Sequence, residues 1–325
     1  MNIKNTNRHK PFIKKSRYYN HCDDTPESFL FQTIPSFMSS LYGRKKRQPE
    51  NKNDWFVQQD PVKSSIEPVI TWIGHATFLI QVAGINILTD PIFGDASVFF
   101  PRIFAPGIPL AHMPPIDVVI LSHNHRDHCD MSSLYGLKKV NPKMTILVPQ
   151  GDKKWLEKKG LASVVEHEWW QSYEHQTAQG LCSFTFLPAH HWSAQGIFDR
   201  NKSLWGSWMI SAHDHHIYFA GDSAYSGHYH HIADQFPLIH TALMPIAPEE
   251  PHPWMRKSHM DAPQAVQAFV DLKAHQFVPM HWGTFPFGLD TFKGPLDRLQ
   301  SAWNLHELGT SKKLTVLKIG ERLII

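Results

Sequence analysis

Residues 120–130 read Ile-Leu-Ser-His-Asn-His-Arg-Asp-His-Cys-Asp, and four side chains able to bind a metal ion fall within six of these positions. They are His123, His125, Asp127 and His128. The apolar run before them, residues 118–121, predicts a buried strand. Sites in α/β proteins form where strands end, so the stretch predicts a metal site at a strand end. The alternative is a polar loop in a chain that has 23 histidines.

Length and composition describe an ordinary folded protein. The chain has 325 residues, of which 42% are hydrophobic and 19% charged, enough for one large domain or two smaller ones. The net charge of +3 is too small to indicate nucleic acid as a general partner. Three widely spaced cysteines, Cys22, Cys129 and Cys182, indicate a reducing compartment and no disulfide framework.

Residues 1–55 are predicted to form a basic N-terminal extension, and residues 56–325 the main domain. The N-terminus lacks the apolar core of a signal peptide, so we expect a cytoplasmic protein. Segment 28–47 is apolar and aromatic at first and ends in Arg44-Lys45-Lys46-Arg47. Such a segment can rest on an anionic lipid surface, here the inner face of a membrane. A short helical piece packed on the main domain is the alternative that Pro35 favours.

From residue 68 onward, β-like runs alternate with helical patterns. Residues 93–116, rich in proline and aromatic residues, predict a long loop. The predicted strands are 69–73, 77–82, 85–89, 117–121, 145–148, 183–187, 205–211, 216–220, 241–245 and 276–280, followed by a closing hairpin at 314–325. The predicted helices are 131–140, 151–160, one capped by Asp261 with Gln264 in a capping box, and 295–308. This order indicates two sheets packed face to face with helices outside, a four-layer αβ/βα sandwich.

Three later strand ends supply one further candidate ligand each: His191, Asp222 and His281. Together with the motif they make five histidines and two aspartates. Nitrogen and carboxylate ligands without cysteine suit zinc, with iron or manganese as alternatives. Seven ligands exceed one tetrahedral ion, but they fit two ions roughly 3.5–4 Å apart if one carboxylate bridges them.

A pair of ions lowers the pKa of a water between them and provides hydroxide at neutral pH, which suits hydrolysis of a phosphodiester, an ester or an amide. No Gly-x-Ser-x-Gly elbow and no Cys–His pattern offers another nucleophile. Asp90 is either a carboxylate that orients a ligand histidine or a turn residue before Pro91, and the sequence leaves both open.

The motif and the later ligands resemble the metallo-β-lactamase superfamily. Further blocks resemble its N-acylphosphatidylethanolamine-hydrolysing phospholipase D branch, and the likeness runs from about residue 50 to the C-terminus. Besides Ser122-His123-Asn124-His125, the blocks are Thr71-Trp72-Ile73-Gly74-His75-Ala76-Thr77, Leu88-Thr89-Asp90-Pro91, Ser203-Leu204-Trp205-Gly206-Ser207-Trp208, Phe219-Ala220-Gly221-Asp222 and His281-Trp282-Gly283-Thr284-Phe285.

The resemblance implies a division of the ligands between two zinc ions. One ion would be held by His123, His125 and His191, the other by Asp127, His128 and His281, with Asp222 as the bridge. His190 competes with His191, but the family pattern places the ligand directly before Trp192. The resemblance also implies catalytic roles for Asp127 and for His259, which would lie near the substrate phosphate. An inert histidine at a helix start is the alternative for His259.

The leading hypothesis is therefore a di-zinc phosphodiesterase of phospholipase D type, which cleaves N-acylphosphatidylethanolamine-like phospholipids through a metal-bridging hydroxide. The first alternative is a soluble hydrolase of a lactone, a cyclic phosphodiester or a sugar phosphate, because a fold does not fix a substrate. The second is a metal-binding protein without catalysis. Arg126 and Cys129 depart from the family motif; neither is a ligand, and Arg126 would add positive charge beside the site. The sequence makes no prediction of oligomeric state.

Overall fold

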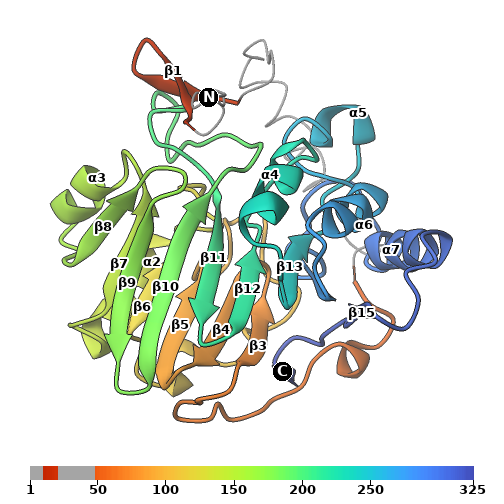
Figure 1. Cartoon of the computed structure of the whole chain (residues 1–325), viewed down its shortest axis with the longest axis horizontal. Helices are drawn as coiled ribbons and strands as arrows, with labels where there is room; N and C mark the ends of the chain where they lie inside the picture. The colour runs from red at the N-terminus through yellow and green to blue at the C-terminus, as the bar shows by residue number, and fades with distance from the viewer. Residues whose placement is uncertain (1–9, 21–47) are drawn as a thin grey trace, which may run out of the picture.

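Two seven-stranded sheets form the framework of the molecule (Figure 1). The computed structural model describes residues 10–20 and 48–325. The first sheet has the order β16-β3-β4-β5-β6-β7-β8, and the second has the order β15-β14-β13-β12-β11-β10-β9. The first sheet consists of β3 (Val69–Gly74), β4 (Thr77–Val82), β5 (Ile85–Thr89), β6 (Val118–Ile120), β7 (Thr145–Pro149), β8 (Val164–His167) and β16 (Arg322–Ile324). The second consists of β9 (Ser172–Thr177), β10 (Gly180–Leu187), β11 (Ser207–Ala212), β12 (His215–Phe219), β13 (Thr241–Pro245), β14 (Gln276–Met280) and β15 (Lys313–Leu314).

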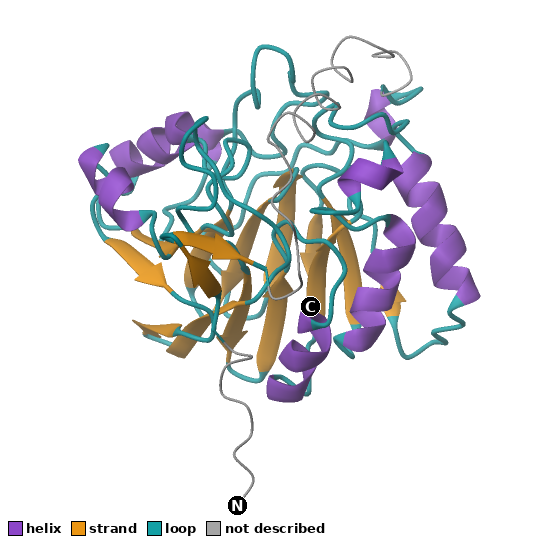
Figure 2. Ribbon diagram, turned by 90° about the horizontal axis from the view of Figure 1, so that it is seen from above, coloured by secondary structure: helices purple, strands orange, loops and turns teal. Residues whose placement is uncertain are grey.

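Helices lie on both sides of the paired sheets, as Figure 2 shows. Leu134 and Leu137 of one helix pack with Val119 of the first sheet, in a cluster separate from the main core. On the other side, Phe269 packs against Phe277 of the second sheet. The helices are α2 (Met131–Val140), α3 (Lys153–Lys158), α4 (His228–Gln235), α5 (His252–Met255), α6 (Ala262–Asp271) and α7 (Gly294–Leu305). This arrangement confirms the predicted four-layer αβ/βα sandwich.

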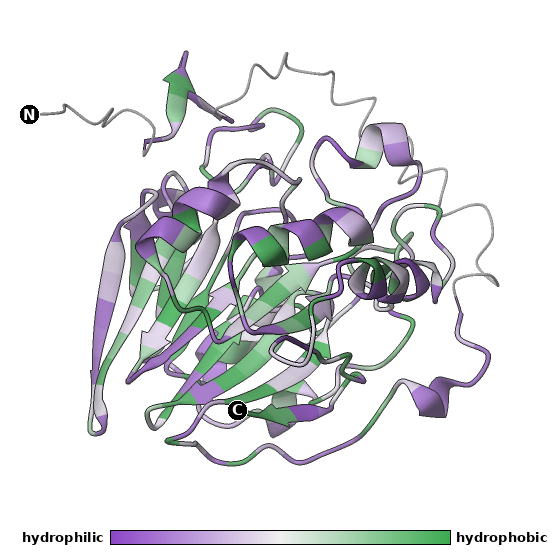
Figure 3. Cartoon of the chain, turned by 45° about the vertical axis from the view of Figure 1, so that its right-hand side comes forward, coloured by the Kyte–Doolittle hydropathy of each residue, from purple (hydrophilic) through white to green (hydrophobic). Residues whose placement is uncertain are grey.

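The main core lies between the sheets, and alternation along the strands explains it. Phe78 and Ile80 of β4 join Phe186 and Trp208 of the second sheet in one cluster, whereas Leu79 joins the helix-facing cluster. Neighbouring residues of a strand point to opposite faces, so a strand buried on both sides is apolar throughout. In Figure 3 the strands inside the molecule are largely green, and the helices alternate between green and purple.

Parallel pairing brings several strand ends to one edge of the sandwich. β5, β6, β7 and β8 run parallel, as do β12, β13 and β14. The loops that follow β6, β10, β12 and β14 carry all the predicted ligands. The fold therefore places these residues together before any side-chain interaction is considered.

The predicted closing hairpin at 314–325 is wrong. β15 pairs with β14 in the second sheet, whereas β16 pairs with β3 in the first. The N–H group of Gly320 donates to the carbonyl of Trp72, so the Gly320 turn closes on β3 and the chain crosses between the sheets.

The other helices and strands differ less from the prediction. Helix α6 begins with the predicted Asp261–Gln264 capping box. The predicted loop at 93–116 holds a short 3₁₀ turn, Leu110–His112, and an isolated bridge between Ser97 and Phe100. The sequence did not predict α4, α5, β8 and β9, nor the hairpin of β1 (Phe12–Lys14) and β2 (Arg17–Tyr19). Segment 28–47 lies outside the described residues, and the boundary at residue 55 stays a prediction. In the described part of the chain, no helix is long and apolar enough to cross a membrane.

Candidate metal centre

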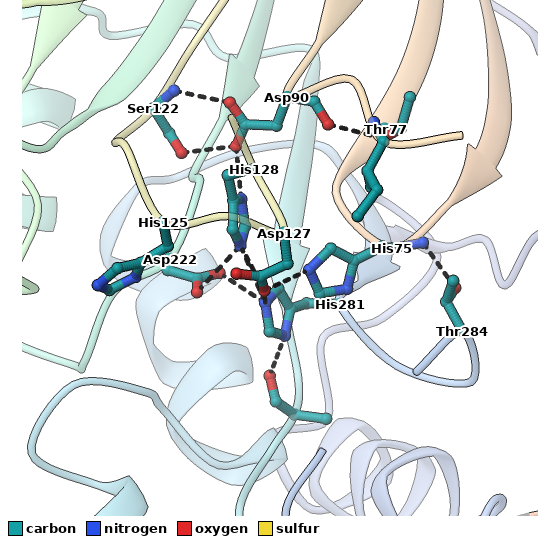
Figure 4. Close-up of polar contacts among 12 residues, drawn as sticks. His75, Thr77, Asp90, Ser122, His125, Asp127, His128, Asp222, His281 and Thr284 are labelled. Atoms are coloured by element: carbon teal, nitrogen blue, oxygen red, sulfur yellow. Dashed lines mark hydrogen bonds and ion pairs between the residues drawn. The ribbon is translucent and has the colours of Figure 1, made fainter. Parts of the chain in front are cut away.

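The histidine motif forms a tight turn between β6 and α2. The N–H groups of His128 and Cys129 both donate to the carbonyl of His125, and Asp130 caps α2 through the N–H groups of Ser132 and Ser133. Because the turn is short, the ring of His123 lies within 4.4 Å of the rings of His125 and His128. Figure 4 shows the side chains of Asp127 and His128 directed toward each other, with His125 on the other side of the turn.

His123, His125 and His191 form the first group of donor atoms. Nε2 of His123 lies 2.7 Å from Nδ1 of His125, and Nε2 of His191 lies 3.3 Å from the same atom. Nε2 of His125 is buried without a hydrogen-bond partner in the described chain. The three nitrogens that converge suit a transition-metal ion.

Asp127, His128 and His281 form the second group, and His75 joins them. Nε2 of His128 lies 3.2 Å from Nε2 of His281 and 3.4 Å from Oδ2 of Asp127. Figure 4 shows the ring of His75 directed at the same carboxylate. The sequence assigned no role to His75, since a lone histidine in a turn carries no spacing signal.

Asp222 lies between the two groups, in the position expected of a bridge. Its Oδ1 is 3.0 Å from Nε2 of His281, and its Oδ2 is 3.3 Å from Nε2 of His128 and 3.8 Å from Nε2 of His191. The structure thus brings all seven predicted ligands together, and their division between two ions stays a prediction.

Four of these histidines have the opposite ring nitrogen held by an oxygen atom. Nδ1 of His123 faces Oγ of Ser122 at 2.8 Å, and Nδ1 of His128 faces Oδ2 of Asp90 at 2.7 Å. Nδ1 of His191 and of His281 face backbone carbonyls, those of Ser258 and Ala247, at 2.7 and 2.8 Å. An acceptor at Nδ1 fixes the hydrogen there and leaves the Nε2 lone pair free for a metal. The residues present therefore fit a pair of metal ions.

The charges of His125, Asp127 and Asp222 suit metal binding. Burial would lower the pKa of His128, but the carboxylates of Asp222 and Asp127 hold it well above its usual value. Burial lowers the pKa of His125 to about 4, so its imidazole is neutral at neutral pH. Burial would raise the pKa of Asp127, but the contacts with His128 and His75 hold it well below its usual range. Asp222 is kept ionised in the same way by His128 and His281. Neutral imidazoles and ionised carboxylates are the forms that bind a metal.

Asp90 resolves the choice that the sequence left open. Its carboxylate is fully buried and accepts hydrogen bonds from the backbone and hydroxyl of Ser122 at 2.7 and 2.5 Å, besides its contact with His128. The structure favours a carboxylate that orients His128, and Asp90 also lies in the turn before Pro91, with φ +33°.

The structure also places the other residues that the sequence singled out near the site. His190 is outside the donor groups, which favours His191 as the ligand. The ring of His259 lies 5.2 Å from that of His191, and its Nδ1 is 3.8 Å from Oδ2 of Asp222. Arg126 is exposed and its Nε donates to the carbonyl of Gln195, whereas Cys129 is buried beneath the motif.

The two groups lie at the base of a cavity of about 470 Å³. His125, Asp127, Asp222 and His281 line it, together with His259. The walls are mostly apolar, with Phe100, Trp192, Ala194, Ile197, Pro248, Trp254, Met255 and Phe287. The volume is in the range of small-molecule sites, so the centre is open to a substrate of that size.

Comparisons with known proteins agree with this geometry. A N-acyl-phosphatidylethanolamine-hydrolyzing phospholipase D of Caenorhabditis elegans is 28% identical over 77% of this chain and 74% of its own length. A mitochondrial protein of the same name from Saccharomyces cerevisiae is 31% identical over 71% of this chain, which spans 50% of that relative. A metallo hydrolase from the archaeon Ignicoccus hospitalis shares the fold, with a TM-score of 0.61 at 22% identity over 79% of this chain and 98% of its own. Residues 85–282, more than half of the chain, match the model of the Beta-lactamase superfamily domain. The chain therefore belongs to the β-lactamase superfamily.

Proposed function

We propose that this protein is a metal-dependent hydrolase that holds two zinc ions and cleaves the phosphodiester bond of N-acylphosphatidylethanolamine-like phospholipids. The observation that carries the proposal is the position of Asp222 between two donor groups at the base of a largely apolar cavity. The names of the worm and yeast relatives support the same substrate class.

Two bound ions would supply Lewis acidity and a water of lowered pKa. The protein's own contribution is to hold the substrate phosphate over the centre and to move a proton. His259 is placed for proton transfer, because its ring lines the cavity and its buried Nδ1 has no hydrogen-bond partner in the described chain. Burial lowers its pKa to about 4, so the neutral ring can accept a proton at neutral pH.

The lining of the cavity suits a substrate with an anionic centre and an apolar tail. Arg126 adds a positive charge at the wall, near Asp127. Phe100, Trp192 and Trp254 offer apolar surface beyond the metal groups. An acyl chain would bury against these rings while the phosphate faces the centre, and each buried methylene contributes about 0.8 kcal/mol.

Five exposed apolar side chains line the cavity or stand next to lining residues in the sequence, and we call them the apolar rim: Val98, Phe99, Ile197, Phe198 and Trp254. Val98 and Phe99 lie at the tip of a turn closed by the Ser97–Phe100 bridge. Ile197 and Phe198 lie at the tip of a second turn, in which Asp199 accepts from the N–H groups of Gln195 and Gly196. The hydrogen bonds within each turn hold the apolar pairs outward.

We propose that the apolar rim contacts a lipid bilayer. Val98 and Phe198 are 86% and 84% exposed, and each adjoins a residue that lines the cavity, Ser97 and Ile197, which distinguishes them from scattered surface residues. Arg256 and Lys257 lie two and three residues after Trp254 and are exposed. Apolar side chains flanked by cations suit an anionic lipid surface. A phospholipid would then enter the cavity without passing through water.

Release of N-acylethanolamine from vesicles tests the proposed activity. Zinc-loaded protein is incubated with phosphatidylcholine vesicles that contain labelled N-acylphosphatidylethanolamine, and both products are measured. We expect N-acylethanolamine and phosphatidate from the natural chain, and none above background from His123→Ala or Asp222→Asn. No release across N-acyl chains of different lengths, by protein with two bound zinc ions, would refute the substrate.

Vesicle sedimentation distinguishes the proposed phospholipid hydrolase from the first alternative, a soluble hydrolase. Val98→Ser and Phe198→Ser are predicted to lose binding to anionic vesicles. Leu305→Ser is the matched control, because Leu305 is 83% exposed at the end of α7 and does not line the cavity. Equal sedimentation of all three variants and the natural chain contradicts the rim contact. No sedimentation of the natural chain favours the soluble hydrolase.

A further inference from the structure

His75 occupies a strained turn between β3 and β4. Its φ is +57°, a region that residues other than glycine rarely adopt, and the preceding Gly74 has φ +123°. Three hydrogen bonds hold this conformation. The N–H of His75 donates to Oγ1 of Thr284 at 2.6 Å, and its carbonyl accepts from Nε1 of Trp72 at 2.9 Å and from the N–H of His281 at 3.2 Å. Strain maintained in this way concentrates at functional sites.

The ring of His75 is 1% exposed and is enclosed by other rings. Its centroid lies 4.0 Å from that of His281 and 5.0 and 5.6 Å from those of Phe285 and Phe287. Nε2 lies 3.0 Å from Oδ2 of Asp127. The turn therefore delivers one polar atom to one carboxylate, as Figure 4 shows.

The hydrogen on His75 can be placed from the partners of the neighbouring rings. His128 and His281 have acceptors at Nδ1, which leaves Nε2 of each as a lone pair. Within the described residues, Nδ1 of His75 has no such acceptor, so its hydrogen is free to reside on Nε2. A neutral ring of this tautomer donates to Asp127 and has no lone pair at Nε2 for a metal.

We propose that His75 is a positioning residue, whose Nε2–H group holds the carboxylate of Asp127 in its metal-binding orientation. The proposal rests on the two-metal function above and deepens it at the second group. His75 thereby acts on Asp127 as Asp90 acts on His128. Loss of a residue that orients a metal ligand in this way weakens metal binding by about 10- to 100-fold.

Two variants separate the donor from the ring. His75→Phe keeps an aromatic ring against Phe285 and Phe287 and removes the donor. His75→Gln loses the ring, but its amide N–H group can reach the place of Nε2. Both are equally strained at φ +57°, so the comparison cancels the backbone cost.

Zinc affinity is measured without substrate, by chelator competition, so a failure of the proposed hydrolysis leaves the result interpretable. We expect the second zinc ion to bind about 10- to 100-fold more weakly in His75→Phe, with the first unchanged, and His75→Gln to restore most of the affinity. The proposal is overturned if His75→Phe binds like the natural chain. It is also overturned if neither variant takes a second ion at saturating zinc, because His75 would then be a ligand.

Imidazole ¹⁵N NMR of the natural zinc-loaded chain covers the case in which neither variant folds. A hydrogen on Nε2 of His75 is expected. An unprotonated Nε2 with a metal-bound shift refutes the proposal.

Discussion

Replacement of Asp90 by asparagine tests how the fold prepares a ligand histidine. Oδ1 of Asp90 accepts from the N–H of Ser122, while Oδ2 accepts from the hydroxyl of Ser122 and lies 2.7 Å from Nδ1 of His128. Asparagine has one carbonyl oxygen, so keeping the first bond turns its NH₂ group toward two donors. His128 must then lose its Nδ1 partner or move its hydrogen to Nε2, where the lone pair is needed.

The expected loss of zinc affinity follows from the single contact between Asp90 and His128. Variants that lose a residue hydrogen-bonded to a metal ligand bind the metal about 10- to 100-fold more weakly, which corresponds to roughly 1.4 to 2.8 kcal/mol of binding free energy. The loss should fall on the second ion, since Asp90 orients His128, with a smaller change at the first ion through Ser122 and His123. Chelator competition on metal-free protein titrated with zinc resolves the two affinities.

Asp152→Asn is the matched control. Asp152 is about as buried as Asp90 and lies near the motif, but the hydrogen bonds that it accepts from Nδ2 of Asn124 and Nε1 of Trp155 reach the same oxygen, Oδ1. Asparagine can keep that acceptor. We expect unchanged zinc affinities in this variant, and natural affinities in Asp90→Asn would refute the role given to Asp90.

Two further predictions concern stability. Burial raises the pKa of Asp152 to about 7, so between about pH 4 and pH 7 the folded chain binds more protons than the unfolded chain and stability falls as pH rises. Asp152→Asn should remove up to about 4 kcal/mol of this pH dependence at about 1.4 kcal/mol per pKa unit, measured by urea unfolding of metal-free protein; an unchanged pH dependence contradicts the assignment. Gly206→Ala should lower stability by about 1–3 kcal/mol, because a Cβ there would lie 2.4 Å from the carbonyl oxygen of Leu187. Gly94→Ala is its control, with no atom within 4 Å, and equal melting temperatures for the two variants would argue against that close approach.

The ligands could be predicted because each carries a signal in the sequence. The motif has short spacing after an apolar run, and His191, Asp222 and His281 each follow a predicted strand. Parallel strands bring such positions to one edge, so the rule that sites lie at strand ends indicated them, and the family resemblance chose His191 over His190.

Other features depend on contacts between distant residues. His75 is one histidine in a turn, and only the approach of Asp127 gives it a role. The available signal in the sequence was the preceding Gly74, because glycine favours the left-handed backbone found there. The sequence around Gly320 predicted a hairpin, although the chain crosses between the two sheets there. A turn glycine does not reveal which strand the turn packs against. Strand β9 was missed because it is a polar edge strand with alternating exposure.

Anomalous diffraction from crystals of the zinc-loaded protein tests the central claim most directly. Two peaks roughly 3.5–4 Å apart are expected. One should lie against His123, His125 and His191, the other against Asp127, His128 and His281, with Asp222 between them. A single peak at saturating zinc, or two peaks that Asp222 does not bridge, would contradict the two-metal centre.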